Sequence, residues 1–293
     1  MTNSGDLKIY AIDSLKDVDA NAWDALDDSG DPFLSHAFLS GLEIHDCLEP
    51  QGWYPLHLVA KDGDELVAAL PLYLKDNSYG EFVFDWAWAD AYERAGGKYY
   101  PKLVSAIPFT PATGNRLLIK AGADTPQLVH HLMEAVKQLM EANNASSFHC
   151  LFPTSMQSAL LAAESLSTRR ACQYHWRNRD YQHFDDYLGE LKSKRRKQIR
   201  KERREAQGSG LDIEQIAGKE ISEHHWHVFH EFYCSTFYRK WGEPRLTEAF
   251  FNYLSEAMPN APLLVLREHP ERGGEARAAR PHDPCTVPMG PIG

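Results

Sequence analysis

Two segments of the chain show the same predicted order of elements: a strand, two helices and a second strand. Apolar alternation and helical spacing predict these elements at residues 7–12, 17–26, 35–48 and 54–61, and again at 211–216, 220–238, 247–258 and 262–266. The outer strands are roughly 50 residues apart in both segments, which indicates an internal duplication. Residue identity between the copies is poor, so the repeat is one of pattern. We therefore expect two related modules of sheet and helix in tandem.

The chain between these segments extends the first module. Asp62-Gly63 marks a two-residue hairpin, and apolar residues at helical spacing between Leu128 and Met140 predict a long helix. The full set of predictions here is strands at 65–75, 78–88, 116–120, 147–152 and 172–177, and helices at 98–107, 126–141, 154–164 and 181–207. The expected fold class is α/β: a mixed sheet flanked by helices, with one complete unit and an incomplete second unit.

The composition changes at the end of the second module. The last 25 residues contain five prolines, four glycines and three arginines, without any apolar period. Such a stretch does not form the hairpin that follows the equivalent strand of the first module. We expect an N-terminal domain at 1–180, a basic helical linker at 181–210, an incomplete second domain at 211–267 and a disordered tail at 268–293. Truncation or a frameshift would produce this pattern.

Charge is distributed unevenly along the chain. The net charge of −10 over 293 residues argues against a protein that coats nucleic acid over its whole surface. Residues 192–205, in contrast, contain nine Lys/Arg and two Glu, a net charge of +7. This run favours phosphate recognition over a solvated helix, with a nucleotide, a tRNA backbone or a lipid headgroup as partner and Arg195, Arg196 and Arg200 as contacts. No aromatic residues are interleaved with the cations, so we expect a grip on phosphates without base stacking.

Neither a metal site nor a membrane span is expected. The five cysteines are widely separated and form no C-x-x-C pair, so neither a zinc site nor a disulfide framework is indicated. The histidines at 224, 225, 227 and 230 lie among aromatic residues that mark a packing face, and no H-E-x-x-H motif is present. The N-terminal residues lack a signal-peptide pattern, and the longest apolar stretch is about half a bilayer span. These features favour a reducing, cytoplasmic location.

Residues 78–88 contain the first candidates for acid–base chemistry. If this segment is a strand, its four alternating aromatic residues face the core, and Glu81 and Asp85 lie on the opposite face. Their i,i+4 separation on a strand is about 13 Å, so they are not expected to share a proton. Either carboxylate is then a candidate general base, and the alternative is that both are solvated.

The following loops supply candidate binding residues. Lys102 and Arg116 carry charges suited to an anionic group, and Thr110 has a hydroxyl that donates hydrogen bonds. The alternative is a proline-stiffened loop with two surface cations. His175 ends a predicted strand, where a neutral imidazole acts as a base or has only a structural role.

Several motifs together resemble a family of predicted bacterial N-acyltransferases, described as FemAB-like and related to peptidoglycan biosynthesis. The order β-α-α-β-β-β-α-β-α-β is that of the GNAT acyltransferase fold, and its repetition suggests two GNAT-like units. The matching motifs lie between roughly residues 30 and 266, at 32–39, 78–89, 99–103, 108–111, 175–176, 194–203 and 240–242.

The resemblance implies transfer of an acyl or aminoacyl group to the amine of a small molecule or peptide. The implied donor is acyl-CoA or aminoacyl-tRNA, with no tightly bound cofactor. A base deprotonates the amine, which attacks the donor carbonyl. Glu81 or Asp85 would be that base beside Tyr79 and Tyr100, and five cations would hold phosphate-bearing groups: Lys102, Arg116, Arg195, Arg196 and Arg200.

The sequence departs from the resemblance in two respects. Members of this family continue past this length and complete the second unit, and the GNAT phosphate-loop pattern Q/R-x-x-G-x-G/A has no complete match here. If the donor binds in the second unit, this chain lacks its donor site and is inactive. Two alternatives follow: a non-catalytic module that binds an anionic partner (RNA, nucleotide or membrane surface) through residues 192–204, or a non-functional fragment.

Overall fold

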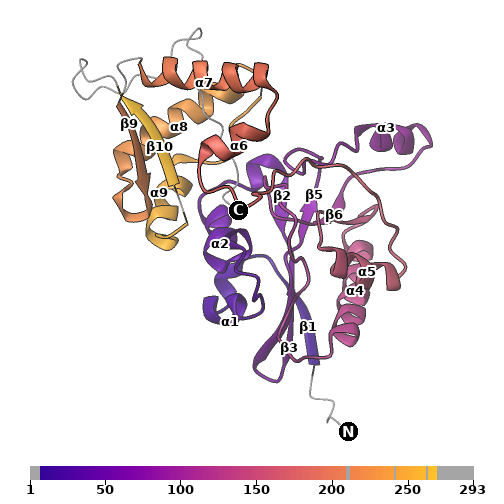
Figure 1. The fold of residues 1–293 in the computed structure, drawn as a ribbon. Helices are drawn as coiled ribbons and strands as arrows, with labels where there is room; N and C mark the ends of the chain where they lie inside the picture. Colours follow the sequence, from indigo (N-terminus) through magenta and orange to yellow (C-terminus); the bar gives the residue numbers. More distant parts are fainter. Residues whose placement is uncertain (1–6, 209–211, 241, 262, 269–293) are drawn as a thin grey trace.

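A computed structural model describes residues 7–208, 212–240, 242–261 and 263–268 (Figure 1). The predicted tail at 268–293 lies, except for Glu268, outside the described residues. The fold is mixed α/β, as the sequence predicts. Figure 1 shows two parts, a larger one built on two four-stranded sheets and a smaller one built on a two-stranded sheet.

One long bent hairpin runs through both sheets of the larger part. The first sheet has the order β1-β3-β4-β7 and is antiparallel throughout, and the second has the order β2-β5-β6-β8 and ends in a parallel pair. The strands are β1 Leu7–Ile12, β2 Trp53–Pro55, β3 His57–Asp62, β4 Glu65–Leu70, β5 Tyr73–Lys75, β6 Lys102–Ser105, β7 Leu118–Ile119 and β8 Phe148–Cys150. Pro71 separates β4 from β5, because proline gives no N–H to the ladder.

Helices cover the sheets on two sides. Figure 1 shows α1 and α2 on one side and α4 and α5 on the other. Their bounds are α1 Ala20–Asp24, α2 His36–Ile44, α4 Thr125–Ala142 and α5 Ser155–Ala163. Short 3-10 turns occupy Leu15–Asp17, Pro32–Leu34 and Glu49–Gln51. The apolar period of α4 is buried as predicted, with Leu132 and Val136 in the core beneath the sheet.

The smaller part repeats the strand–helix–helix–strand order of the larger one. It contains α6 Phe184–Glu190, α7 Ser193–Gln207, β9 Asp212–Ala217, the 3-10 turn Gly218–Glu220, α8 Glu223–Tyr238, α9 Glu248–Ala257 and β10 Leu263–Glu268. The outer strands β9 and β10 pair antiparallel, as β1 and β3 do. The helices that occupy equivalent positions, α2 and α9, pack on each other: the rings of Phe38 and Phe250 are 5.6 Å apart, and the Tyr253 hydroxyl donates to the Ala37 carbonyl at 3.2 Å.

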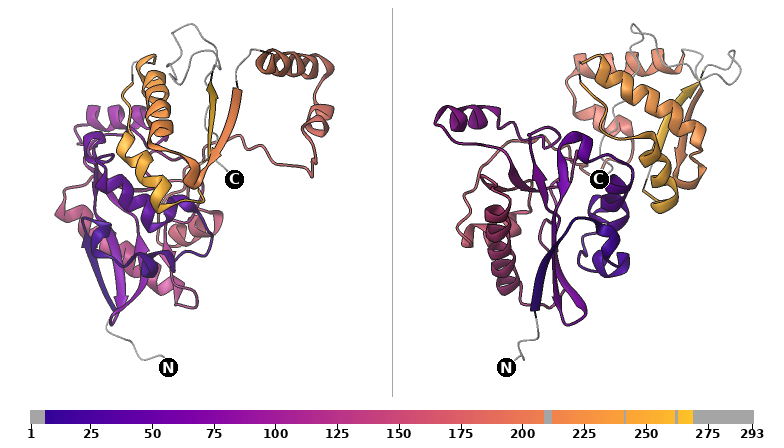
Figure 2. Two further views of the ribbon diagram at one scale, coloured as in Figure 1. Left: turned by 90° about the vertical axis from the view of Figure 1, so that its left-hand side faces the viewer. Right: turned by 180° about the vertical axis from the view of Figure 1, so that it is seen from behind.

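Four local predictions were wrong. Residues 78–88 form a loop that leads into α3 Trp86–Arg94, and 98–107 contain β6 in place of a helix. Residues 172–177 are extended and exposed without strand pairing, and 181–207 divide into α6 and α7. The aromatic residues expected in the core are exposed, with Phe84 at 76% and Trp88 at 65%. In Figure 2, α3 projects from one side of the molecule and the α6–α7 pair projects from another.

Candidate functional site

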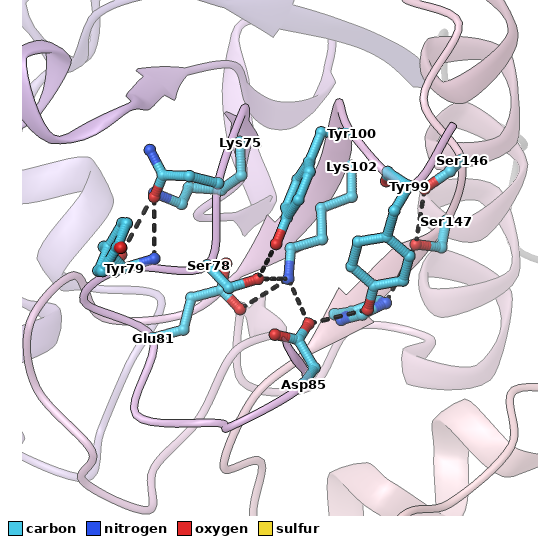
Figure 3. Close-up of polar contacts among 12 residues, drawn as sticks. Lys75, Ser78, Tyr79, Glu81, Asp85, Tyr99, Tyr100, Lys102, Ser146 and Ser147 are labelled. Atoms are coloured by element: carbon cyan, nitrogen blue, oxygen red, sulfur yellow. Dashed lines mark hydrogen bonds and ion pairs between the residues drawn. The ribbon is translucent and has the colours of Figure 1, made fainter. Parts of the chain in front are cut away.

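A buried lysine organises the polar cluster at the start of β6. Lys102 Nζ donates hydrogen bonds to Asp85 Oδ2 at 2.7 Å, Ser78 Oγ at 2.8 Å and Glu81 Oε2 at 2.9 Å (Figure 3). The lysine and both carboxylate side chains are 0 to 1% exposed. All three protons of the ammonium are therefore used inside the protein.

Two adjacent tyrosines complete the cluster. The Tyr99 hydroxyl donates to Asp85 Oδ2 at 2.8 Å, and the hydroxyls of Tyr100 and Ser78 are 2.7 Å apart. Both tyrosines precede Lys102 in the chain, with Pro101 between them and the lysine, and β6 is held in place by pairing with β5 and β8. Figure 3 shows the loop that carries Ser78, Glu81 and Asp85 folded across this strand end.

The loop needs Gly80 in order to fold this way. Gly80 has φ +80°, and a Cβ atom there would lie 2.6 Å from the ring of Phe109. Glycine is the residue that adopts this conformation without steric cost. The close approach brings the carboxylates of Glu81 and Asp85 over Lys102.

The two carboxylates differ in electrostatic state. Burial raises the pKa of Glu81 despite the opposing attraction of Lys102. Burial alone would also raise the pKa of Asp85, but hydrogen bonds from Lys102, Ser78 and Tyr99 outweigh it and lower this pKa. Glu81 Oε1 and Asp85 Oδ1 are both buried without a hydrogen-bond partner in the described part of the chain. The site thus combines a stable carboxylate ion with a second carboxyl group that accepts a proton more readily.

This geometry corrects two predictions about the same residues. Glu81 and Asp85 were expected to be about 13 Å apart on a strand, but a loop replaces the strand and both bind the same nitrogen. Lys102 was expected to hold an anionic ligand. It is fully buried and its protons are already donated, so it does not serve as a surface phosphate contact.

Two further basic groups, neither of them predicted from the sequence, border the cluster. Lys75 Nζ donates to the carbonyls of Gln51 at 3.1 Å and Tyr79 at 3.3 Å, and burial lowers its pKa to about 7. His149 lies on β8, where burial and the charge of Lys102 lower its pKa to about 4. His149 is therefore neutral at pH 7. No local motif marks it, since it reaches the site only through the parallel pairing of β8 with β6.

Arg116 has a structural role in place of the predicted ligand contact. Its side chain is fully buried, and it donates to the carbonyls of Ala112 at 2.7 Å, Asn115 at 2.8 Å and Leu151 at 2.9 Å. Every described hydrogen-bond partner of the guanidinium is a backbone carbonyl, so this group fixes the loop before β7 to the end of β8. The prediction that it holds an anion was wrong.

The other predicted residues lie outside the Lys102 cluster. The exposed Tyr79 ring packs 5.0 Å from Trp86, and Thr110 donates to the Pro108 carbonyl at 3.2 Å. His175 is exposed and its Nε2 is 3.1 Å from Gln173 Oε1.

The three arginines predicted as phosphate contacts lie on α7, which Figure 1 shows in a different part of the molecule from β6, the strand that carries Lys102. Arg195 NH1 donates to Gln198 Oε1 at 3.1 Å, Arg196 NH2 to the Leu191 carbonyl at 3.1 Å, and Arg200 pairs with Asp185 at 2.8 Å. The structure thus separates these arginines from the Lys102 cluster on β6.

Among the described residues, no group of three or more His, Cys, Asp and Glu side chains is arranged to hold a metal ion. His227 and His230 instead face the carboxylate of Glu248, with nitrogen–oxygen distances of 3.2 and 3.7 Å. No helix in the same described ranges has the length and apolar character needed to cross a bilayer.

The sequence places this chain in a known family. Residues 14–278 match the FemAB-like family, described as peptidoglycan biosynthesis/recognition, and the chain belongs to that family. This match confirms the FemAB-like resemblance found in the sequence. No curated protein sequence matches the chain at a significant level.

Solved structures similar to this one include two N-acetyltransferases and FemX. The ribosomal-protein-alanine N-acetyltransferase from Brucella melitensis biovar Abortus 2308 is 10% identical over 59% of this chain and 98% of its own, with a TM-score of 0.33. The aminoglycoside 6′-N-acetyltransferase from Acinetobacter haemolyticus is 12% identical over 59% and 99%, with a TM-score of 0.35. FemX is 12% identical over 73% of this chain and 48% of its own, with a TM-score of 0.37, so this chain spans about half the length of FemX.

Proposed function

We propose that this chain is built for transfer of an acyl or aminoacyl group to an amine, with Glu81 as the general base. The observation that carries the proposal is the pair of carboxylates on one buried lysine, whose pKa values shift in opposite directions. Two titratable groups whose environments separate their pKa values are a common basis for acid–base roles. The reaction class is the one that the sequence resemblance implies, and membership of the FemAB-like family supports it.

The separation of pKa values assigns different roles to the two carboxylates. Asp85 remains ionised and, with Lys102 and Ser78, positions Glu81. Glu81 Oε1 has no partner within the described residues and takes the proton from the acceptor amine. The amine nitrogen then bonds to the donor carbonyl carbon, the bond to the leaving thiolate or ribose oxygen breaks, and that leaving group receives the proton.

Access to Glu81 requires movement of its loop, because the residue is only 2% exposed. The loop has two positive-φ residues, Gly80 and Phe82, and it carries exposed Tyr79 and Phe82 rings on its outer surface. A substrate amine would enter when these rings move away from the Lys102 cluster. We infer a donor that is acyl-CoA or aminoacyl-tRNA and an acceptor that is a small-molecule or peptide amine.

Replacement of the base provides the test. Glu81→Gln keeps the side-chain shape but removes the proton acceptor, so we expect kcat to fall by about 10²- to 10⁴-fold. The assay would offer labelled acyl-CoA and aminoacyl-tRNA to a panel of primary amines and lysine-containing peptides. Glu134→Gln, at an exposed carboxylate on α4, is the matched control and should leave kcat unchanged. Full activity in Glu81→Gln would exclude Glu81 as the base.

A second candidate function is binding of an anionic partner without catalysis. The exposed cationic surface of α7 favours it, since the helix buries none of its residues. Salt-dependent binding with no turnover of either donor would support this alternative.

A further inference from the structure

An aromatic pocket lies directly before the basic helix. The rings of Trp176, Tyr181, Phe184 and Tyr187 line an open cavity of about 490 Å³, together with Asn178 and Gln182. Trp176 and Tyr181 are stacked, with centroids 6.2 Å apart and an interplanar angle of 25°, and Tyr187 meets each of them edge-on at 5.9 Å. These rings were not predicted as partners of the basic helix, because they lie in the preceding segment.

These rings do not form a hydrophobic core. Trp176 is 66% exposed and Phe184 is 44% exposed, although both lie within a cluster of aromatic neighbours. Exposed apolar side chains that gather on one surface, in contrast to scattered ones, indicate a binding site. The Nδ2 atom of Asn178 and the Oε1 atom of Gln182 have no partner among the residues that the structure describes, so the pocket also offers one donor and one acceptor.

Cations extend from the pocket along α7. Arg203 lies 4.3 Å from the Phe184 ring centroid, which places a guanidinium at the pocket rim. Of the nine Lys/Arg in 192–205, two form salt bridges with described residues, Arg200 with Asp185 and Lys201 with Glu205. Lys194, Lys197 and Arg204 form no salt bridge within the described ranges.

The acidic groups beside the pocket are mostly engaged. Asp186 accepts from the backbone N–H groups of Gln182 and His183 at the start of α6, and Glu190 pairs with Arg179. Asp185 is paired with Arg200. Residues 169–207 hold 13 Lys/Arg against six Asp/Glu, a net charge of +7, so the surface remains positive.

We propose that this surface binds a single-stranded nucleic acid, with bases stacked in the aromatic pocket and phosphates along α7. Aromatic rings accept any base by stacking, and a neighbouring row of cations follows the backbone. Bases in a duplex are stacked on each other and unavailable to the pocket, so the site should prefer single strands. The polar edges of Asn178 and Gln182 are suited to exposed base edges. This proposal does not depend on acyl transfer.

Fluorescence anisotropy with the full chain would test it, using labelled rU12, dT12 and a 12-base-pair RNA duplex. We expect the single strands to bind more tightly than the duplex, and the ratio of the rU12 and dT12 affinities identifies the preferred sugar. Trp176→Ala should weaken single-strand binding by about 5- to 150-fold without changing the salt slope. Trp88→Ala is the matched control, since Trp88 is equally exposed at 65% but lies on α3.

Removal of positive charge should change the salt dependence of binding, which Trp176→Ala leaves unchanged. The triple variant Lys194→Ala/Lys197→Ala/Arg204→Ala should reduce the slope of log K against log salt concentration by up to about 2, because each phosphate contact on a single strand contributes about 0.7. Both variants change exposed side chains, so they should retain the wild-type melting temperature. Equal affinity for duplex and single strand, unaffected by Trp176→Ala, would overturn the proposal. Binding to phosphatidylserine vesicles with no binding of rU12 or dT12 would overturn it as well.

Discussion

Lys102→Met should be strongly destabilising, because it leaves two carboxylates buried without their cation. The substitution keeps the side-chain length and removes three hydrogen bonds of 2.7 to 2.9 Å. Removal of one partner from a buried ion pair typically costs about 3–5 kcal/mol. The variant can reduce this electrostatic penalty if Glu81 or Asp85 takes up a proton. At pH 7 this costs about 4 kcal/mol for a carboxyl group of ordinary pKa, which limits the penalty for each carboxylate.

The pH dependence distinguishes this mechanism from lost packing. Without Lys102 the folded-state pKa of both carboxyl groups should lie above the unfolded value. A raised carboxyl pKa destabilises the fold above the unfolded pKa, so stability should be recovered as pH falls from 7 towards 4. The deficit of the variant relative to the wild type should therefore shrink over this range.

Urea unfolding at pH 7, 5.5 and 4 measures both effects. Lys120→Met is the matched control, since Lys120 pairs with Glu65 at the surface, where such pairs contribute at most about 1 kcal/mol. If Lys102→Met costs no more than Lys120→Met, or if its deficit is the same at all three pH values, the carboxylates are not buried ions held by Lys102. The assignment of separate roles to Glu81 and Asp85 would then fail.

Two further predictions concern neighbouring buried groups. Arg116→Met should lower the free energy of unfolding by about 3–5 kcal/mol, because three buried carbonyls lose their donor. The control Arg94→Met, at an exposed ion pair, should change the free energy of unfolding by less than about 0.5 kcal/mol. Equal effects of the two substitutions in urea titrations would contradict this account. His149 has a folded pKa of about 4, below its ordinary value of 6.5, so the unfolded chain binds the proton first and stability is lost as pH falls between these values. His149→Gln should reduce that loss by up to about 1.4 kcal/mol per pH unit, and unchanged pH profiles of unfolding would show that the imidazole is not desolvated.

The sequence predicted those elements whose pattern is local. The helix α4 has a one-sided apolar stripe, and Asp62-Gly63 is a hairpin signal that needs no distant partner. Residues 78–88 were predicted as a strand, because aromatic residues at every second position imitate strand alternation. Ala87 within this run and Ala89 and Ala91 after it are strong helix formers, and all three are helical in the structure.

The candidate site is formed by residues from separate segments of the chain, so no single segment predicts it. Glu81 and Asp85 were predicted as alternative bases beside Tyr100, and Lys102 as a phosphate contact. Their shared cluster was not predicted, because it depends on how the loop folds across β6. His149 was missed for the same reason, since it joins the site only through strand pairing. The aromatic pocket was not predicted, because its rings precede the charged run and the contact of Phe184 with Arg203 depends on the fold.

The packing of α2 on α9 bears on the proposed division of the chain into domains. Phe250 is 1% exposed and belongs to the same apolar core as Trp23 and Leu39 of the first module. At Gly41 a Cβ atom would lie 2.5 Å from the Tyr253 ring, so the two helices approach as closely as glycine permits. A chain that ended near residue 180 would expose this contact to water. The proposed boundary at residue 180 therefore separates two modules of sequence, while the hydrophobic core that stabilises the first module extends into the second.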